Sequence, residues 1–271
     1  MTLRTAVINL RCGEDITANL DSAEHYIRAA HKDGAKFIVT PENTLLMQGN
    51  TKKLFAAIKS EQETLGAARF SALAKELGID LLIGSMAIRL SDTKAANRSY
   101  HFGADGNIKA HYDKIHMFDV TINETETWQE SANYQAGDTP VMTDTGGFKI
   151  GLSICYDLRF ANLYKYYARQ GAHILTVPAA FTAITGQAHW RTLLRARAIE
   201  TSAYVVAAAQ GGIHDNGRAT WGRSMIIDPW GEVIAELDND APGFCCADLS
   251  LDLVENTRAR IPAWQQETML K

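Results

Sequence analysis

The chain has 271 residues and 46% of them are hydrophobic, so it is long enough to bury a large core. Its formal net charge at pH 7 is only −4 and it has no basic block, which disfavours nucleic acids and anionic membranes as partners. No linker is evident, and residues 1–271 are predicted to form a single domain.

The first predicted elements alternate between strands and helices. Residues 1–10 are interpreted as a strand, and neither as a signal peptide nor as a membrane span, because no long hydrophobic segment with a cleavage site is present. Residues 36–42 read as a short apolar strand halted by Pro41, with Glu42 at its exit. Two amphipathic helices flank this strand, with apolar positions Leu20, Ala23, Ile27 and Ala30 before Gly34, and Phe70, Leu73, Ala74 and Leu77 before Gly78.

The middle of the chain places two reactive side chains after strands. Strands are predicted over residues 81–88, 99–102 and 108–112, and Lys114 follows the last of them. Apolar residues alternate over residues 148–154, as in a half-buried strand, and Cys155 follows directly. This is a good place for a nucleophile, because a sheet edge fixes the sulfur and the next turn can aim backbone N–H groups at a substrate oxygen. The alternative is an inert buried cysteine.

The last third of the chain continues the mixed pattern. A strand over 174–177, a helix over 190–200, and strands over 204–209, 224–228, 232–236 and 244–247 are predicted, with a turn at 229–231. Residues 210–215 contain glycines without a phosphate-loop pattern and are expected to form a loop. The interleaving indicates a layered α and β protein. The four cysteines, Cys12, Cys155, Cys245 and Cys246, form no secreted disulfide framework, which favours reduced thiols and a cytoplasmic location.

Glu42, Lys114 and Cys155 share one kind of position, the exit of a predicted strand. A carboxylate, an ammonium and a thiol could converge on one cleft if the three strands are neighbours. Taken singly, Glu42 and Lys114 are more often solvated surface charges. The prediction of a catalytic site therefore depends on the three residues together.

Three segments around these residues resemble the signature segments of the nitrilase superfamily of carbon–nitrogen hydrolases: Thr40-Pro-Glu42-Asn, Tyr112-Asp-Lys114-Ile-His and Cys155-Tyr-Asp-Leu-Arg159-Phe. Further matching segments extend the resemblance over nearly the whole chain, and they are most similar to the Nit-type amidases. The resemblance implies an α/β fold built as a four-layer α-β-β-α sandwich. It also implies a homodimer, an enzyme without a cofactor, and no metal.

The resemblance assigns roles that fit what amide cleavage demands. Cys155 would attack the carbonyl as a thiolate and hold the acyl group as a thioester. Glu42 would accept the thiol proton, deliver it to the leaving amine and then activate water. Lys114 would stabilise the oxyanion together with the backbone N–H of Tyr156, and its charge is expected to favour the thiolate.

Further side chains are implied around the trio. Glu130 is expected to hold Lys114 or orient the substrate, with a surface charge as the alternative. Arg159 is predicted to anchor a substrate carboxylate, because its planar fork can form a bidentate pair, with a salt bridge to Asp157 or another acid as the alternative. The remaining predicted substrate-binding residues are Tyr156, Phe181 and Thr185.

The predicted function is a thiol-dependent amidase that acts on a small carboxylate-bearing substrate. Deaminated glutathione is the leading substrate, and omega-amidase activity on α-ketoglutaramate is the alternative. A nitrilase and a papain-like Cys–His hydrolase are less favoured. A catalytically silent nitrilase-fold protein, acting in interactions or redox sensing, is the alternative from another class. Ala136, Ala161 and Asn162 depart from the family's common pattern, which leaves substrate preference open.

Overall fold

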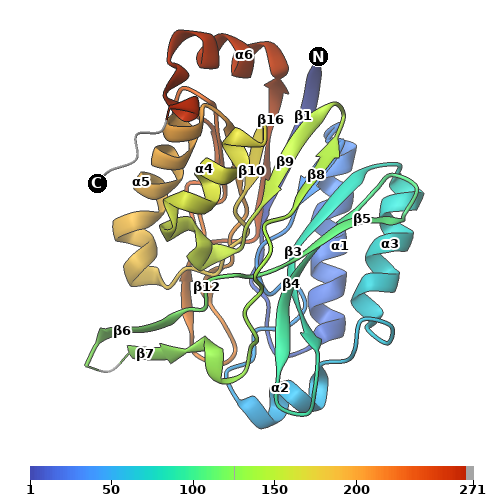
Figure 1. Cartoon of the computed structure of the whole chain (residues 1–271). Helices are drawn as coiled ribbons and strands as arrows, with labels where there is room; N and C mark the ends of the chain where they lie inside the picture. Colours follow the sequence, from blue (N-terminus) through green and yellow to red (C-terminus); the bar gives the residue numbers. More distant parts are fainter. Residues whose placement is uncertain (125, 267–271) are drawn as a thin grey trace.

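The computed structural model describes residues 1–124 and 126–266. Two six-stranded sheets face each other, and helices cover both outer faces: α1 and α3 lie on one side of Figure 1, and α4 and α5 on the other. The predicted α/β fold with four layers, α-β-β-α, is confirmed.

The first sheet has the strand order β16-β1-β2-β3-β4-β5. The strands β1, β2 and β3 are parallel, whereas β16, β4 and β5 each pair antiparallel with their neighbour. Helices α1 (Ile16–Lys32) and α3 (Leu65–Leu77) pack on its outer face. The strand bounds are β1 Thr2–Asn9, β2 Phe37–Val39, β3 Asp80–Arg89, β4 Ala95–Phe102, β5 Ile108–Asp113 and β16 Gly243–Ser250.

The second sheet has the order β15-β14-β11-β10-β9-β8, with β9, β10 and β11 parallel. Helices α4 (Ala161–Arg169) and α5 (Ala183–Thr201) cover it. Its strands are β8 Met142–Thr145, β9 Phe148–Leu152, β10 Ile174–Thr176, β11 Tyr204–Ala207, β14 Met225–Ile227 and β15 Val233–Glu236. The remaining elements are α2 Thr51–Ala57, α6 Leu251–Arg260, the hairpins β6 Asp119–Asn123 with β7 Glu126–Gln129 and β12 Gly211–Ile213 with β13 Ala219–Trp221, and the 3₁₀ helices Glu130–Ala132, Cys155–Arg159 and Pro262–Gln265.

Strand β1 shows how the layers are held together. Alternate side chains of a strand point to opposite faces of its sheet. Val7 accordingly belongs to the core between the two sheets, whereas Ala6 and Ile8 belong to the core between the first sheet and its helices. Ile27 of α1 packs in that same outer core, and full burial of such a side chain stabilises the fold by about 1.5–3 kcal/mol. The side chain of Asp15 begins α1 by accepting from the backbone N–H of Thr17 at 2.8 Å.

The helices predicted before Gly34 and Gly78 are confirmed as α1 and α3, and residues 1–10 contain β1. The predicted start of the helix at residue 190 is wrong, because α5 begins at Ala183, where the Thr182 side chain accepts from the Thr185 N–H. The predicted loop at 210–215 is also wrong, since β12 pairs there with β13. None of the helices in residues 1–124 and 126–266 is long and apolar enough to cross a membrane.

All four cysteines are free thiols in this structure, as predicted from their number and spacing. Cys12 and Cys155 are buried, whereas Cys245 and Cys246 on β16 are partly exposed.

Candidate functional site

Three strand ends meet at the site, but they are not neighbours in one sheet. Glu42 follows β2 and Lys114 follows β5, with β3 and β4 between those strands, whereas Cys155 follows β9 in the other sheet. Neighbouring strands were a condition for convergence, and the three side chains meet without it. The residues meet because β2 and β5 run in the same direction, so their carboxyl ends lie at one edge of the first sheet, against the end of β9.

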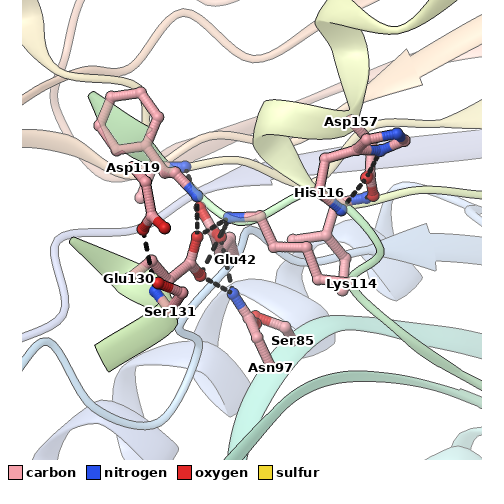
Figure 2. A network of polar contacts seen from close by, with 12 residues as sticks. Glu42, Ser85, Asn97, Lys114, His116, Asp119, Glu130, Ser131 and Asp157 are labelled. Carbon is pink, nitrogen blue, oxygen red and sulfur yellow. Dashed lines mark hydrogen bonds and ion pairs between the residues drawn. The ribbon is translucent and has the colours of Figure 1, made fainter. Parts of the chain in front are cut away.

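Lys114 lies between two glutamates (Figure 2). Its Nζ donates to Glu42 Oε1 at 2.9 Å and to Glu130 Oε2 and Oε1 at 2.8 and 3.1 Å. Only 2% of the lysine is exposed, so both ion pairs lie away from bulk water. The position of Glu130 is secured by the backbone N–H of Phe118, which donates to Oε2 at 2.7 Å. Glu130 thus holds Lys114, one of the two arrangements expected for it.

Asn97 on β4 joins the same group, although no sequence signal singled it out. Its Nδ2 donates to Glu42 Oε1 at 2.9 Å and to Glu130 Oε1 at 3.1 Å (Figure 2). Ionised carboxylates only accept hydrogen bonds, so this contact also decides which amide atom is nitrogen. The buried amide therefore links the two carboxylates, and the Asn97 carbonyl accepts from the Lys114 N–H at 3.0 Å, which ties β4 to the segment that carries the lysine.

Cys155 occupies an unusual backbone conformation at the start of its 3₁₀ helix. Its φ is +50°, in the left-handed region that costs a non-glycine residue roughly 1–2 kcal/mol. Its N–H donates to Pro178 O at 2.8 Å, and its side chain hydrogen-bonds Glu42. A backbone conformation of this kind is retained only where surrounding contacts hold it in place, and it is common at reactive sites. The Cys155 residue is 7% exposed.

Asp157 fixes the turn that carries Cys155. Its buried carboxylate accepts from the Ile154 N–H at 2.8 Å, from Tyr112 Oη at 2.8 Å, and from the N–H of His116 at 3.0 Å. The nucleophile turn is thereby tied to the segment that contains Lys114. Because these contacts occupy Asp157, the alternative of a salt bridge between it and Arg159 is wrong.

The charges in the site perturb one another. Burial raises the pKa of the Cys155 thiol, the Glu42 charge adds to this, and Lys114 opposes it without cancelling it. Burial also raises the pKa of Glu42, but the Lys114 charge and the hydrogen bond from Cys155 outweigh this and leave it below its usual value. Burial lowers the pKa of Lys114, but the two glutamates raise it well above its usual value. The Lys114 charge therefore favours the Cys155 thiolate, as expected, but burial and the Glu42 charge outweigh it, and the pKa of the thiol is raised overall.

These residues line a cleft of about 600 Å³. None of the described residues that line it is a histidine, which leaves the papain-like alternative without a base. No group of three or more potential metal ligands occurs in residues 1–124 and 126–266. The predicted site residues that line the cleft are Glu42, Lys114, Glu130, Cys155, Tyr156, Phe181 and Thr185.

Arg159 does not line the cleft. Its guanidinium carbon lies 5.8 Å from the ring centre of Tyr156 and 5.4 Å from that of Phe181, and its Nη2 contacts His189 Nδ1 at 3.2 Å. The arginine thus packs against two rings that do line the cleft.

Arg218 and Trp128 line the cleft and were missed in the sequence. Arg218 lies between β12 and β13, in the hairpin that the sequence pattern did not reveal, and Trp128 lies on β7. The Arg218 guanidinium carbon stands 4.5 Å from the Trp128 ring centre.

Comparisons with known proteins agree with this geometry. A family model described as carbon-nitrogen hydrolase matches residues 4–259. A deaminated glutathione amidase of Synechocystis is 37% identical over 271 residues, covering 98% of each chain, and the omega-amidase NIT2 of Homo sapiens is 34% identical, covering 98% of this chain and 95% of that protein. Among solved structures, the NitFhit protein of C. elegans has a TM-score of 0.90 at 33% identity; the match covers 98% of this chain but only 65% of NitFhit.

Proposed function

Because the chain belongs to the carbon–nitrogen hydrolase family, we propose that it hydrolyses the amide bond of a small, carboxylate-bearing substrate through a thioester on Cys155, with deaminated glutathione as the favoured substrate. The observation that carries the mechanism is the meeting of Glu42, Lys114 and Cys155 in one cleft. The family membership and the similar amidases make it a carbon–nitrogen hydrolase acting on amides.

The first half of the reaction forms the thioester. As the Cys155 sulfur attacks the amide carbon, its proton passes to Glu42, which already hydrogen-bonds the thiol. The carbonyl oxygen gains negative charge, which the buried Lys114 ammonium and the backbone N–H of Tyr156 stabilise. Glu42 then gives the proton to the departing nitrogen, and the carbon–nitrogen bond breaks.

The second half returns the enzyme to its starting state. Glu42, again ionised, takes a proton from water, whose oxygen attacks the thioester carbon. The carbon–sulfur bond breaks, and the proton returns to the sulfur. Glu130 and Asn97 act on this cycle indirectly, since they hold Lys114 and Glu42 in place.

Omega-amidase activity is the second candidate function, because omega-amidase NIT2 is similar over almost the whole chain. The two activities separate by comparing kcat/KM for deaminated glutathione and for α-ketoglutaramate.

Replacement of the nucleophile tests the mechanism. We expect Cys155→Ala to lose at least about 10⁴-fold in turnover while its circular dichroism is unchanged, because Cys155 is the one thiol among the described residues that line the cleft. Mass spectrometry of the wild type with substrate should show an acyl adduct on Cys155. Cys246→Ala, which changes a partly exposed thiol on β16, is the control. Amine release by Cys155→Ala at the wild-type rate would refute the mechanism, and a wild type without turnover but with an oxidised Cys155 would favour the redox alternative.

We also propose that the chain is a single catalytic domain that functions as a cytoplasmic homodimer. The match of the family model over residues 4–259 and the free cysteines support the first and second points, and the resemblance to Nit-type amidases supports the dimer. Light scattering of the purified chain tests the dimer.

A further inference from the structure

We propose that Arg218, and not Arg159, binds the substrate carboxylate. This inference rests on the proposed amidase function and deepens it, since it names the residue that would select carboxylate-bearing amides over neutral ones.

Arg218 lies next to the reacting groups. Its Nη2 donates to the carbonyl oxygen of Ala180, and the N–H of the same Ala180 donates to Glu42 Oε2 at 2.9 Å. One residue therefore holds both the guanidinium and the proposed base. The positive charge of Arg218 also lowers the pKa of the Glu42 carboxyl. This effect is smaller than those of burial, of the Lys114 charge and of the Cys155 hydrogen bond. A substrate that reaches Cys155 thus passes within the field of this cation.

The charge of Arg218 is not matched by a carboxylate. Among the described residues that line the cleft, the cationic side chains are Lys114 and Arg218, and Lys114 is already paired with both Glu42 and Glu130. Among the residues that the structure describes, no carboxylate lies within 4 Å of the Arg218 guanidinium, and its buried Nε–H has no partner. A buried donor is normally satisfied, and the guanidinium fork suits a carboxylate. Arg218 is therefore the cation in this cleft that can accept an anionic ligand.

The guanidinium is held in place by its surroundings. It stacks 4.5 Å from the ring centre of Trp128, a contact that suits a planar cation. The loop beneath it is fixed, since Asn216 Oδ1 accepts from the Arg218 N–H at 3.0 Å and the His214 N–H donates to Arg218 O at 2.9 Å. Asn216 in turn donates to Met47 O at 3.1 Å. A group ordered beforehand loses little freedom on binding, which favours affinity.

Arg159 has a different position. It packs against the rings of Tyr156 and Phe181 and contacts His189, without lining the cleft. It acts on substrates through those two rings, as a positioning residue. Its loss should therefore affect charged and neutral amides alike, whereas loss of a carboxylate anchor should affect the charged one alone.

Equilibrium binding to the inactive Cys155→Ala protein tests this assignment. The probes are glutaramate, which has an amide at one end and a carboxylate at the other, and pentanamide, which lacks the carboxylate. We expect Arg218→Gln to weaken glutaramate binding about 100-fold and to leave pentanamide binding unchanged, because a cation that faces the carboxylate is removed. Arg218→Lys should weaken glutaramate binding about tenfold, since an ammonium lacks the bidentate fork.

Arg260→Gln is the matched control, because the Arg260 guanidinium carbon also lies over a tryptophan ring, 4.3 Å from the centre of Trp230, and neither residue lines the cleft. The assignment is overturned if Arg218→Gln binds glutaramate as well as its parent does, if the parent itself does not prefer glutaramate over pentanamide, or if Arg159→Gln produces an equal and equally selective loss. If Arg218→Gln does not fold, as judged by circular dichroism, Arg218→Lys decides the question.

Hydrolysis by proteins that retain Cys155 separates this inference from the proposed function. If the wild type hydrolyses glutaramate but Arg218→Gln has an unchanged KM, the inference fails while the amidase function stands. If the wild type binds glutaramate through Arg218 but releases no ammonia from any amide, the amidase function fails while the carboxylate site stands.

Discussion

Lys114 is the residue whose removal should affect stability and activity in separable ways. Its ammonium lies 2.9 Å from Glu42 and 2.8 Å from Glu130, and all three groups are largely buried. At an effective dielectric constant of about 20, each attraction is roughly 6 kcal/mol before desolvation is subtracted. Lys114→Met keeps most of the side-chain volume but leaves two carboxylates with Asn97 as their shared donor. Breaking a buried ion pair in this way usually costs about 3–5 kcal/mol.

We therefore expect Lys114→Met to lower Tm by about 10 °C, since roughly 2–4 °C corresponds to each kcal/mol in a chain of this size. Adding Glu130→Gln removes one of the stranded charges and should recover about half of that loss, without restoring turnover. Scanning calorimetry and ammonia release from an amide give the two measurements. Lys109→Met, which removes a partly exposed ammonium near Asp80 and Asp144, is the control and should change Tm by less than about 2 °C. The reasoning is refuted if Lys114→Met melts with the wild type, or if the second substitution destabilises it further.

Two further predictions concern the thiol and its neighbours. Because burial, with the Glu42 charge, raises the pKa of Cys155 above its ordinary 9.0, the thiolate fraction should still be increasing above pH 9, so the iodoacetamide rate should climb through that range. A plateau below pH 8 would contradict this. Asn97→Leu removes the donor that Glu42 and Glu130 share. We expect kcat, measured by ammonia release, to fall about tenfold, because that ratio corresponds to the free energy of one hydrogen bond to a charged group. Asn107→Leu, which loses an exposed contact to Asp105, should leave kcat unchanged, and equal losses in the two variants would count against a positioning role for Asn97.

Local patterns predicted the elements that position the site. Alternation over residues 148–154 located β9, and the spacing of apolar residues before Gly78 located α3, because a half-buried strand and a surface helix each bury one face. The hairpins β6–β7 and β12–β13 were missed. Their strands have three to five residues each, too few for a period to appear, and their pairing depends on partners that the local sequence does not name.

Residue types predicted the reacting groups but not the contacts that hold them. Glu42, Lys114 and Cys155 were identified because their chemistry suits amide cleavage and their segments resemble a known family. The sequence around Asn97 does not distinguish it from other polar residues of a strand. Its role depends on two carboxylates that lie 55 and 33 positions away along the chain. The raised pKa of Cys155 likewise comes first from burial, which only the packed structure reveals.

The division of the reacting groups between two sheets has a mechanical consequence. Glu42 and Lys114 belong to one sheet and Cys155 to the other, so the alignment between sulfur and base depends on how the two layers are stacked. A slide of one layer by a fraction of an ångström would leave every strand intact and still separate the proton donor from its acceptor. Apolar side chains in the core between the two sheets, such as Val7 and Phe37, therefore fix the distance between the Cys155 sulfur and Glu42. They also contribute to the stability of the fold.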